Sequence, residues 1–140
     1  MALKDKITKI KIVRNKDKGT VLERYKKSFF HAIDGFIYAF KFEHNVIVIL
    51  ISALLTIIFG FIFHLSVLEW LFCIIIIGMI LATELINTSI EALVDLVTPE
   101  IHPLAKIAKD TASTAVLILC TTALIGGLII FIPKIIGILI

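Results

Sequence analysis

The side chains with the clearest capacity for chemistry lie in an apolar part of the chain. Glu84, Asn87, Glu91 and Asp95 are separated by three, four and four residues. On an α-helix these steps place all four on a stripe about 80° wide. Charged groups in a membrane-spanning helix are costly and are candidates for function by default. A charge at a helix end would explain Asp95 alone, but not the other three residues on one face.

The expected depth of this stripe places it where a lipid headgroup meets solutes of the cytosol. If Glu69 marks one membrane boundary, a rise of about 1.5 Å per residue puts Glu84 roughly 22 Å inward. The hydrocarbon layer is about 30 Å thick, so Glu84 should lie just inside its far edge. Glu43, Lys109 and Asp110 stand at the starts of the neighbouring apolar segments and are expected at the same level.

Together these residue types supply the groups that phosphoryl transfer needs. A carboxylate at the hydrocarbon edge could accept a proton from a lipid hydroxyl. Carboxylates farther out could hold Mg²⁺, which binds oxygen ligands and nucleotide phosphates, and a lysine could neutralise phosphate charge. The sequence contains no GxxxxGK[ST] loop and no HRD or DFG motif, so neither common nucleotide-binding fold applies.

Four helices are expected to position these groups. Apolar side chains recur at steps of three and four over residues 20–42, which predicts an amphipathic helix on the membrane surface. Residues 46–63 carry no charge over eighteen positions, enough for a first membrane span. Further spans are predicted at 69–97, ended by prolines, and at 105–132. The sequence therefore predicts an all-α membrane protein.

Composition and charge agree with a membrane location. The chain has 140 residues and is 59% hydrophobic, against roughly 45–50% in soluble domains. Eleven of the fourteen Lys and Arg residues precede residue 45, and Lys106 and Lys109 lie between the last two predicted spans. Basic residues favour the cytoplasmic side, so the N-terminus and this connection should face the cytoplasm.

The basic N-terminal part could also be interpreted as a nucleic-acid-binding arm. Because a membrane segment follows it directly, a membrane surface is the better partner, and we expect no nucleic-acid partner. Residues 1–19 are expected to form a polar, basic segment ahead of one membrane domain, residues 20–140.

Other functions could use the same polar groups. Intramembrane carboxylates also serve transporters and proton relays, but no polar residues continue the stripe across the other half of the membrane. A non-catalytic scaffold would leave the stripe without a purpose. A zinc site of Glu91, Asp95 and His102 is conceivable but not favoured. Gly126 and Gly127 are expected to be a point of close helix packing rather than a phosphate loop.

Two sequence blocks resemble the signature of the prokaryotic diacylglycerol kinase family. They are ELINTSIEALVD at 84–95 and AKIAKDTAS at 105–113, in that order. The resemblance covers about residues 20–133. The segments SFFHA, SVLEW and HPLAK, which begin at Ser28, Ser66 and His102, are most similar to the Gram-positive branch, whose members are usually undecaprenol kinases.

The resemblance implies a surface helix and three spans, assembled as a homotrimer with shared sites in a bacterial cell membrane. It implies ATP and Mg²⁺, and a lipid hydroxyl as acceptor, on undecaprenol or alternatively on diacylglycerol. Glu84 would be the general base, supported by Asn87, and Glu43 and Glu91 would bind Mg²⁺. The implied ATP-binding positions are Arg24, His31, Glu43, Glu91, Glu100, Ile101, His102, Lys109 and Asp110. The implied lipid-binding positions are Arg24, Glu84 and Ser113.

Overall fold

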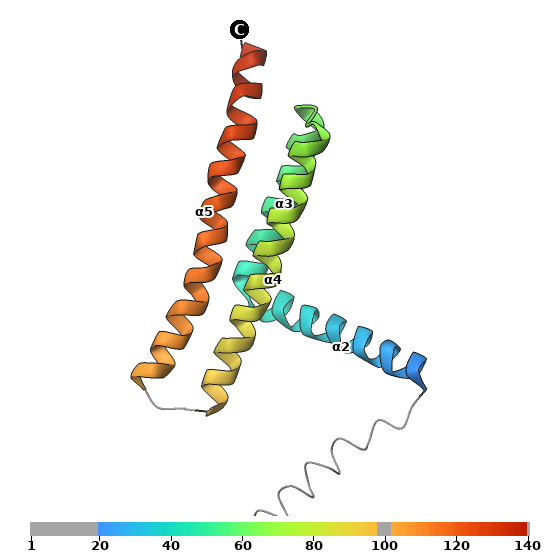
Figure 1. The fold of residues 1–140 in the computed structure, drawn as a ribbon, viewed down its shortest axis with the longest axis vertical. Coiled ribbons are helices and arrows are strands. Elements are labelled where there is room, and N and C mark those ends of the chain that lie inside the picture. Colours follow the sequence, from blue (N-terminus) through green and yellow to red (C-terminus); the bar gives the residue numbers. More distant parts are fainter. Residues whose placement is uncertain (1–19, 98–101, 140) are drawn as a thin grey trace, which may run out of the picture. The chain divides into compact units, whose positions relative to one another are not determined.

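The computed structural model describes residues 20–97 and 102–139, and within these residues all regular elements are helices. They are α2 (Val21–Phe42), α3 (His44–Ile62), α4 (Val67–Val97) and α5 (Pro103–Leu139) (Figure 1). The last three are each long and apolar enough to cross a membrane. The prediction of three long apolar helices preceded by a further helix is therefore confirmed. The chain divides into two compact units between Ile37 and Tyr38.

The first described turn of α2 is fixed by a capping box. The Thr20 backbone N–H donates to Glu23 Oε2 at 2.8 Å, and the Glu23 N–H donates to Thr20 Oγ1 at 3.3 Å. This reciprocal pair satisfies N–H groups that have no partner within the helix. The helix therefore begins where the sequence pattern of apolar side chains also begins.

A tight turn joins α3 to α4 and reverses the chain. His64 adopts a left-handed conformation with φ 51°, and the Leu65 N–H donates to the Gly60 carbonyl at 3.0 Å. This is the pattern of a Schellman motif, which closes the end of a helix. The Ser66 N–H then donates to Glu69 Oε2 at 2.6 Å, and the Glu69 N–H to Ser66 Oγ at 3.4 Å, which starts α4 with a second capping box.

One face of α4 forms the centre of the second unit, because α4 packs against both α3 and α5. The buried side chains of α4 follow steps of three and four residues from the first to the fifth, and the sixth comes directly after: Cys73, Ile76, Ile80, Glu84, Asn87 and Thr88. Most large apolar side chains on the other faces of the three long helices are exposed. Such surfaces suit contact with hydrocarbon, where the helical backbone satisfies its own hydrogen bonds.

The boundaries of α5 correct the sequence prediction. It begins at Pro103, not at about residue 105, and continues through Pro133 to Leu139, beyond the predicted end at 132. Proline suits the first helical position because its missing N–H has no intrahelical role there. Pro133, in the interior of α5, costs one backbone hydrogen bond, and membrane helices tolerate this loss. The apolar run Ile135–Ile138 continues the helix after it.

Two glycines allow α4 to approach its neighbours closely. A Cβ atom at Gly60 of α3 would lie 2.5 Å from a ring carbon of Trp70 in α4. A Cβ atom at Gly126 of α5 would overlap the ring of Phe72 in α4. At Gly127 a Cβ atom would meet nothing within 4 Å. The prediction of close helix packing is confirmed for Gly126.

We predict that Gly126→Ala destabilises the protein, because the added methyl group must displace the Phe72 ring. Overpacking of this kind typically costs about 1–3 kcal/mol. Thermal unfolding in detergent should show a lower midpoint for Gly126→Ala. The matched control, Gly127→Ala, should have an unchanged or higher midpoint, since alanine is the better helix former. Equal midpoints for both variants would contradict this account of the α4–α5 contact.

Candidate active site

A cavity of about 290 Å³ in the second unit brings polar side chains of three helices together. Asn45 comes from α3, Glu84 and Asn87 from α4, and Ser113 from α5. The remaining lining residues are Val48, Ile49, Val116, Leu117 and Cys120. A few polar groups in a mostly apolar cavity are typical of a site that orients a small reactive group.

Glu84 is the acidic side chain that lines this cavity. Only 1% of its surface is exposed, and it nevertheless lines the cavity. The packed helices therefore separate its carboxylate from bulk solvent, while a group inside the cavity could still reach it. The structure shows Glu84 and Asn87 on one face of α4, as their spacing predicted, and shows in addition that both are buried.

Asn87 links α4 to α5 through a short chain of hydrogen bonds. Its Nδ2 donates to Glu91 Oε1 at 2.9 Å, and its Oδ1 accepts a longer bond from Ser113 Oγ at 3.4 Å. The two bonds fix which way the amide faces, because only Nδ2 can donate. Asn87 thereby orients a carboxylate on one side and a hydroxyl on the other.

A larger apolar cavity of about 580 Å³ adjoins this polar one. The two share Val48, Ile49 and Cys120 among their lining residues. The larger cavity runs between α3 and α5 over α4, and most of its lining side chains are aliphatic or aromatic. A cavity with polar groups and a larger apolar cavity therefore adjoin each other within the second unit.

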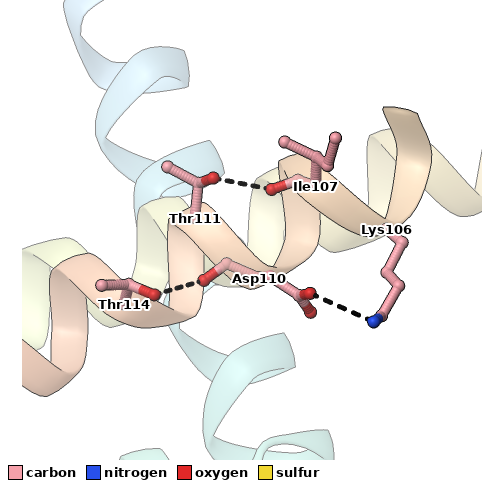
Figure 2. Close-up of polar contacts among 5 residues, drawn as sticks. All are labelled: Lys106, Ile107, Asp110, Thr111 and Thr114. Carbon is pink, nitrogen blue, oxygen red and sulfur yellow. Dashed lines mark hydrogen bonds and ion pairs between the residues drawn. The ribbon is translucent and has the colours of Figure 1, made fainter. Parts of the chain in front are cut away.

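The first turns of α5 carry a set of charged and hydroxyl side chains. Figure 2 shows Lys106 Nζ 3.8 Å from Asp110 Oδ2. The hydroxyls of Thr111 and Thr114 donate at 2.7 Å to the backbone carbonyls of Ile107 and Asp110. These threonine hydroxyls are bonded within the helix, whereas the Asp110 carboxylate stands on an exposed surface.

Lys109 contacts α4 rather than its own helix. Its Nζ lies 2.6 Å from Asp95 Oδ1. The structure therefore joins one residue predicted to bind nucleotide to the outermost acid of the α4 stripe.

The other predicted site residues lie in several places. Glu43 occupies the N-cap position of α3, where its side chain makes no capping bond. His102 caps α5, because its Nδ1 accepts the Leu104 N–H at 3.2 Å. Arg24 and His31 are on the part of α2 within the first unit, and their roles stay predictions. Glu100 and Ile101 lie outside the described residues.

The structure does not support the zinc alternative. Within residues 20–97 and 102–139 there is no group of three or more His, Cys, Asp or Glu side chains that could hold a metal ion. Two of the three residues concerned have other partners, since Asp95 pairs with Lys109 and His102 caps α5.

Two cavity residues were missed by the sequence analysis. Asn45 lies in the first turn of α3, and a polar side chain two residues after Glu43 was the signal for it. Cys120 follows Ser113 by two helical turns and therefore lies on the same face of α5. Its apolar surroundings in the sequence gave no indication of this position.

Comparisons with known proteins show the family to which the chain belongs. Residues 30–131 match the model of the family described as prokaryotic diacylglycerol kinase. The chain is 42% identical over 120 residues to the undecaprenol kinase of Bacillus subtilis, covering 86% of this chain and 98% of that one. It is 41% identical over 96 residues to a diacylglycerol kinase of Helicobacter pylori, covering 69% and 75%. It is 32% identical over 114 residues to a diacylglycerol kinase of Synechocystis, covering 81% and 65%. The resemblance seen in the sequence is confirmed: this chain belongs to the prokaryotic diacylglycerol kinase family of lipid kinases.

Proposed function

We propose that this protein transfers the γ-phosphate of ATP to the hydroxyl of undecaprenol in the membrane. The observation that carries the proposal is the buried Glu84, which lines a cavity with a few polar groups beside a larger apolar cavity. A lipid could place its hydroxyl at Glu84 and its hydrocarbon in the apolar cavity. The relative named undecaprenol kinase is matched over 98% of its length, which favours this lipid. Diacylglycerol is the second candidate, because other relatives carry that name.

In the proposed reaction Glu84 acts as general base. Its carboxylate takes the proton from the lipid hydroxyl while the hydroxyl oxygen forms a bond to the γ-phosphorus of ATP. The bond between that phosphorus and the β–γ bridging oxygen breaks, and ADP leaves with the bridging oxygen. Asn87 supports the base by keeping Glu91 and Ser113 in fixed orientations. Ser113 would contact the lipid headgroup.

The residues present fit Mg²⁺ as the ion that accompanies ATP. Mg²⁺ is commonly held by one or two carboxylates together with substrate phosphates and water. Glu43 offers a carboxylate that its helix cap does not use, and Glu91 offers a second one oriented by Asn87. Bound there, the ion would neutralise charge on the phosphates. Lys109 and Asp110, with Arg24, His31 and residues 100–102, would bind the nucleotide.

The membrane arrangement that we propose follows the distribution of basic residues. The N-terminus and the connection between α4 and α5 face the cytoplasm, and the α3–α4 turn faces outward.

Residues 20–140 act as one membrane domain, and three copies assemble with sites shared between neighbours. Light scattering of the detergent-solubilised particle should give the mass of three chains, and the mass of one chain would contradict the assembly.

We predict that Glu84→Gln loses turnover but keeps nucleotide binding. Glutamine has the same shape and cannot accept the proton, and loss of a general base costs about 10²–10⁴-fold. The kinase rate and the binding of a non-hydrolysable ATP analogue should be measured on the same purified variant. Glu69→Gln, at the other end of α4, is the matched control and should retain the parent rate. Near-parental turnover in Glu84→Gln would show that Glu84 is not the base.

A separate prediction concerns Glu43 and Glu91. Changing either to Gln removes a charged oxygen ligand while keeping the side-chain shape. The apparent affinity for Mg·ATP and the turnover should both fall, each by about 10-fold or more. Titration of Mg²⁺ at fixed ATP, with Glu69→Gln as control, measures this. Unchanged Mg²⁺ dependence in both variants would refute the assignment.

The orientation can be tested with cysteines placed at two exposed leucines. In a background without Cys73 and Cys120, Leu68→Cys lies in the first turn of α4 and Leu104→Cys in the first turn of α5. An impermeant thiol reagent added to intact cells should label the first and not the second. The reverse pattern would show the opposite orientation.

A further inference from the structure

One contact between α4 and α5 has no part in the mechanism as described so far. Asp95, near the end of α4, and Lys109, in the second turn of α5, are joined by the 2.6 Å contact from Nζ to Oδ1. The distance is that of a direct hydrogen bond between two charged groups. The pair therefore bridges the two helices beside the connection between them.

The Lys109 side chain is less exposed than that of the neighbouring lysine of α5. Lys106 is one turn away on the same helix, and 77% of its side chain is exposed. The Lys109 side chain is 35% exposed. A lysine has a long flexible stem, so a fixed partner removes much of the freedom of its ammonium group. Asp95 also follows Glu91 by one turn on α4. The contact with Asp95 therefore holds the ammonium group of Lys109 about one helical turn from Glu91, measured along α4.

We infer that Asp95 is a positioning residue for nucleotide binding, which holds Lys109 ready to receive a phosphate of Mg·ATP. This inference rests on the proposed function. The ammonium group has three N–H donors; one is given to Asp95, and two remain for phosphate oxygens. The Asp95 side chain is 65% exposed, and exposed ion pairs contribute little to folding. Its charge therefore serves the position of Lys109 rather than the stability of the fold.

The test begins with Asp95→Asn, which keeps the size of the side chain and removes its charge. The KM for Mg·ATP should rise about 10-fold, the effect expected when one member of a coupled charge pair is lost. The kcat at saturating ATP should stay within about twofold of the parent, because no group in contact with the reacting atoms has changed. Thermal unfolding should be unchanged, and Asp95→Glu should restore most of the affinity.

Glu69→Gln supplies the matched control. Glu69 Oε2 and Lys134 Nζ form another ion pair between α4 and α5, at 3.1 Å, and Glu69 is at the opposite end of α4 from Asp95. Glutamine also preserves the capping box of α4. Its KM for Mg·ATP should equal that of the parent. A rise equal to that of Asp95→Asn would show a general effect of helix packing and would overturn the inference.

Lys109→Met separates failure of the inference from failure of the proposed nucleotide site. If Lys109→Met raises the KM and Asp95→Asn does not, the positioning role alone is overturned. A lower KM in Asp95→Asn would mean that Asp95 competes with phosphate for Lys109, and this result would also overturn the positioning role. If Lys109→Met leaves the KM unchanged, Lys109 does not bind nucleotide and both assignments fall. In the double variant, Asp95→Asn should add nothing to Lys109→Met, and additive effects would contradict the inference.

Discussion

The burial of a polar face of α4 in an otherwise apolar bundle is the constraint on which the rest of the structure depends. Glu84 and Asn87 lie on the same face as Cys73, Ile76 and Ile80. Polar groups are expensive to bury without partners, so this face requires neighbours that offer both space and hydrogen bonds. Ser113 of α5 provides a bond to Asn87, and the cavity beside Glu84 provides the space.

Close packing in the first turns of α4 accompanies this arrangement. Gly60 and Gly126 lie where the rings of Trp70 and Phe72 would meet any larger side chain, so α3 and α5 approach α4 closely through its first turns. The ion pair between Glu69 and Lys134 joins α4 and α5 near the same end. The cavity that contains Glu84 lies farther along the helices. The glycine contacts hold the three helices together, while the cavities beside Phe72 and Glu84 leave space next to α4.

The sequence predicted the parts of this structure that depend on local pattern. Periodic apolar residues indicated the four helices, and the spacing of Glu84 and Asn87 indicated that they share one face of α4. Pro133 misled the prediction because the cost of an interior proline is outweighed by the apolar residues beyond it. Asn45 was missed although its polar side chain two residues after Glu43 was a signal for it. The partnership of Asp95 with Lys109 could not be predicted, because it depends on how separate helices meet. Ligand roles at Glu43 and Glu91 remain proposals.

The most direct test of this account is phosphate transfer to a defined lipid. Purified protein in mixed micelles would receive labelled ATP, Mg²⁺ and either undecaprenol or diacylglycerol at the same mole fraction. The account predicts labelled undecaprenyl phosphate, formed faster than labelled phosphatidic acid and dependent on Mg²⁺. Faster formation of phosphatidic acid would contradict the proposed lipid. Transfer to neither lipid by correctly folded protein would contradict the proposed reaction.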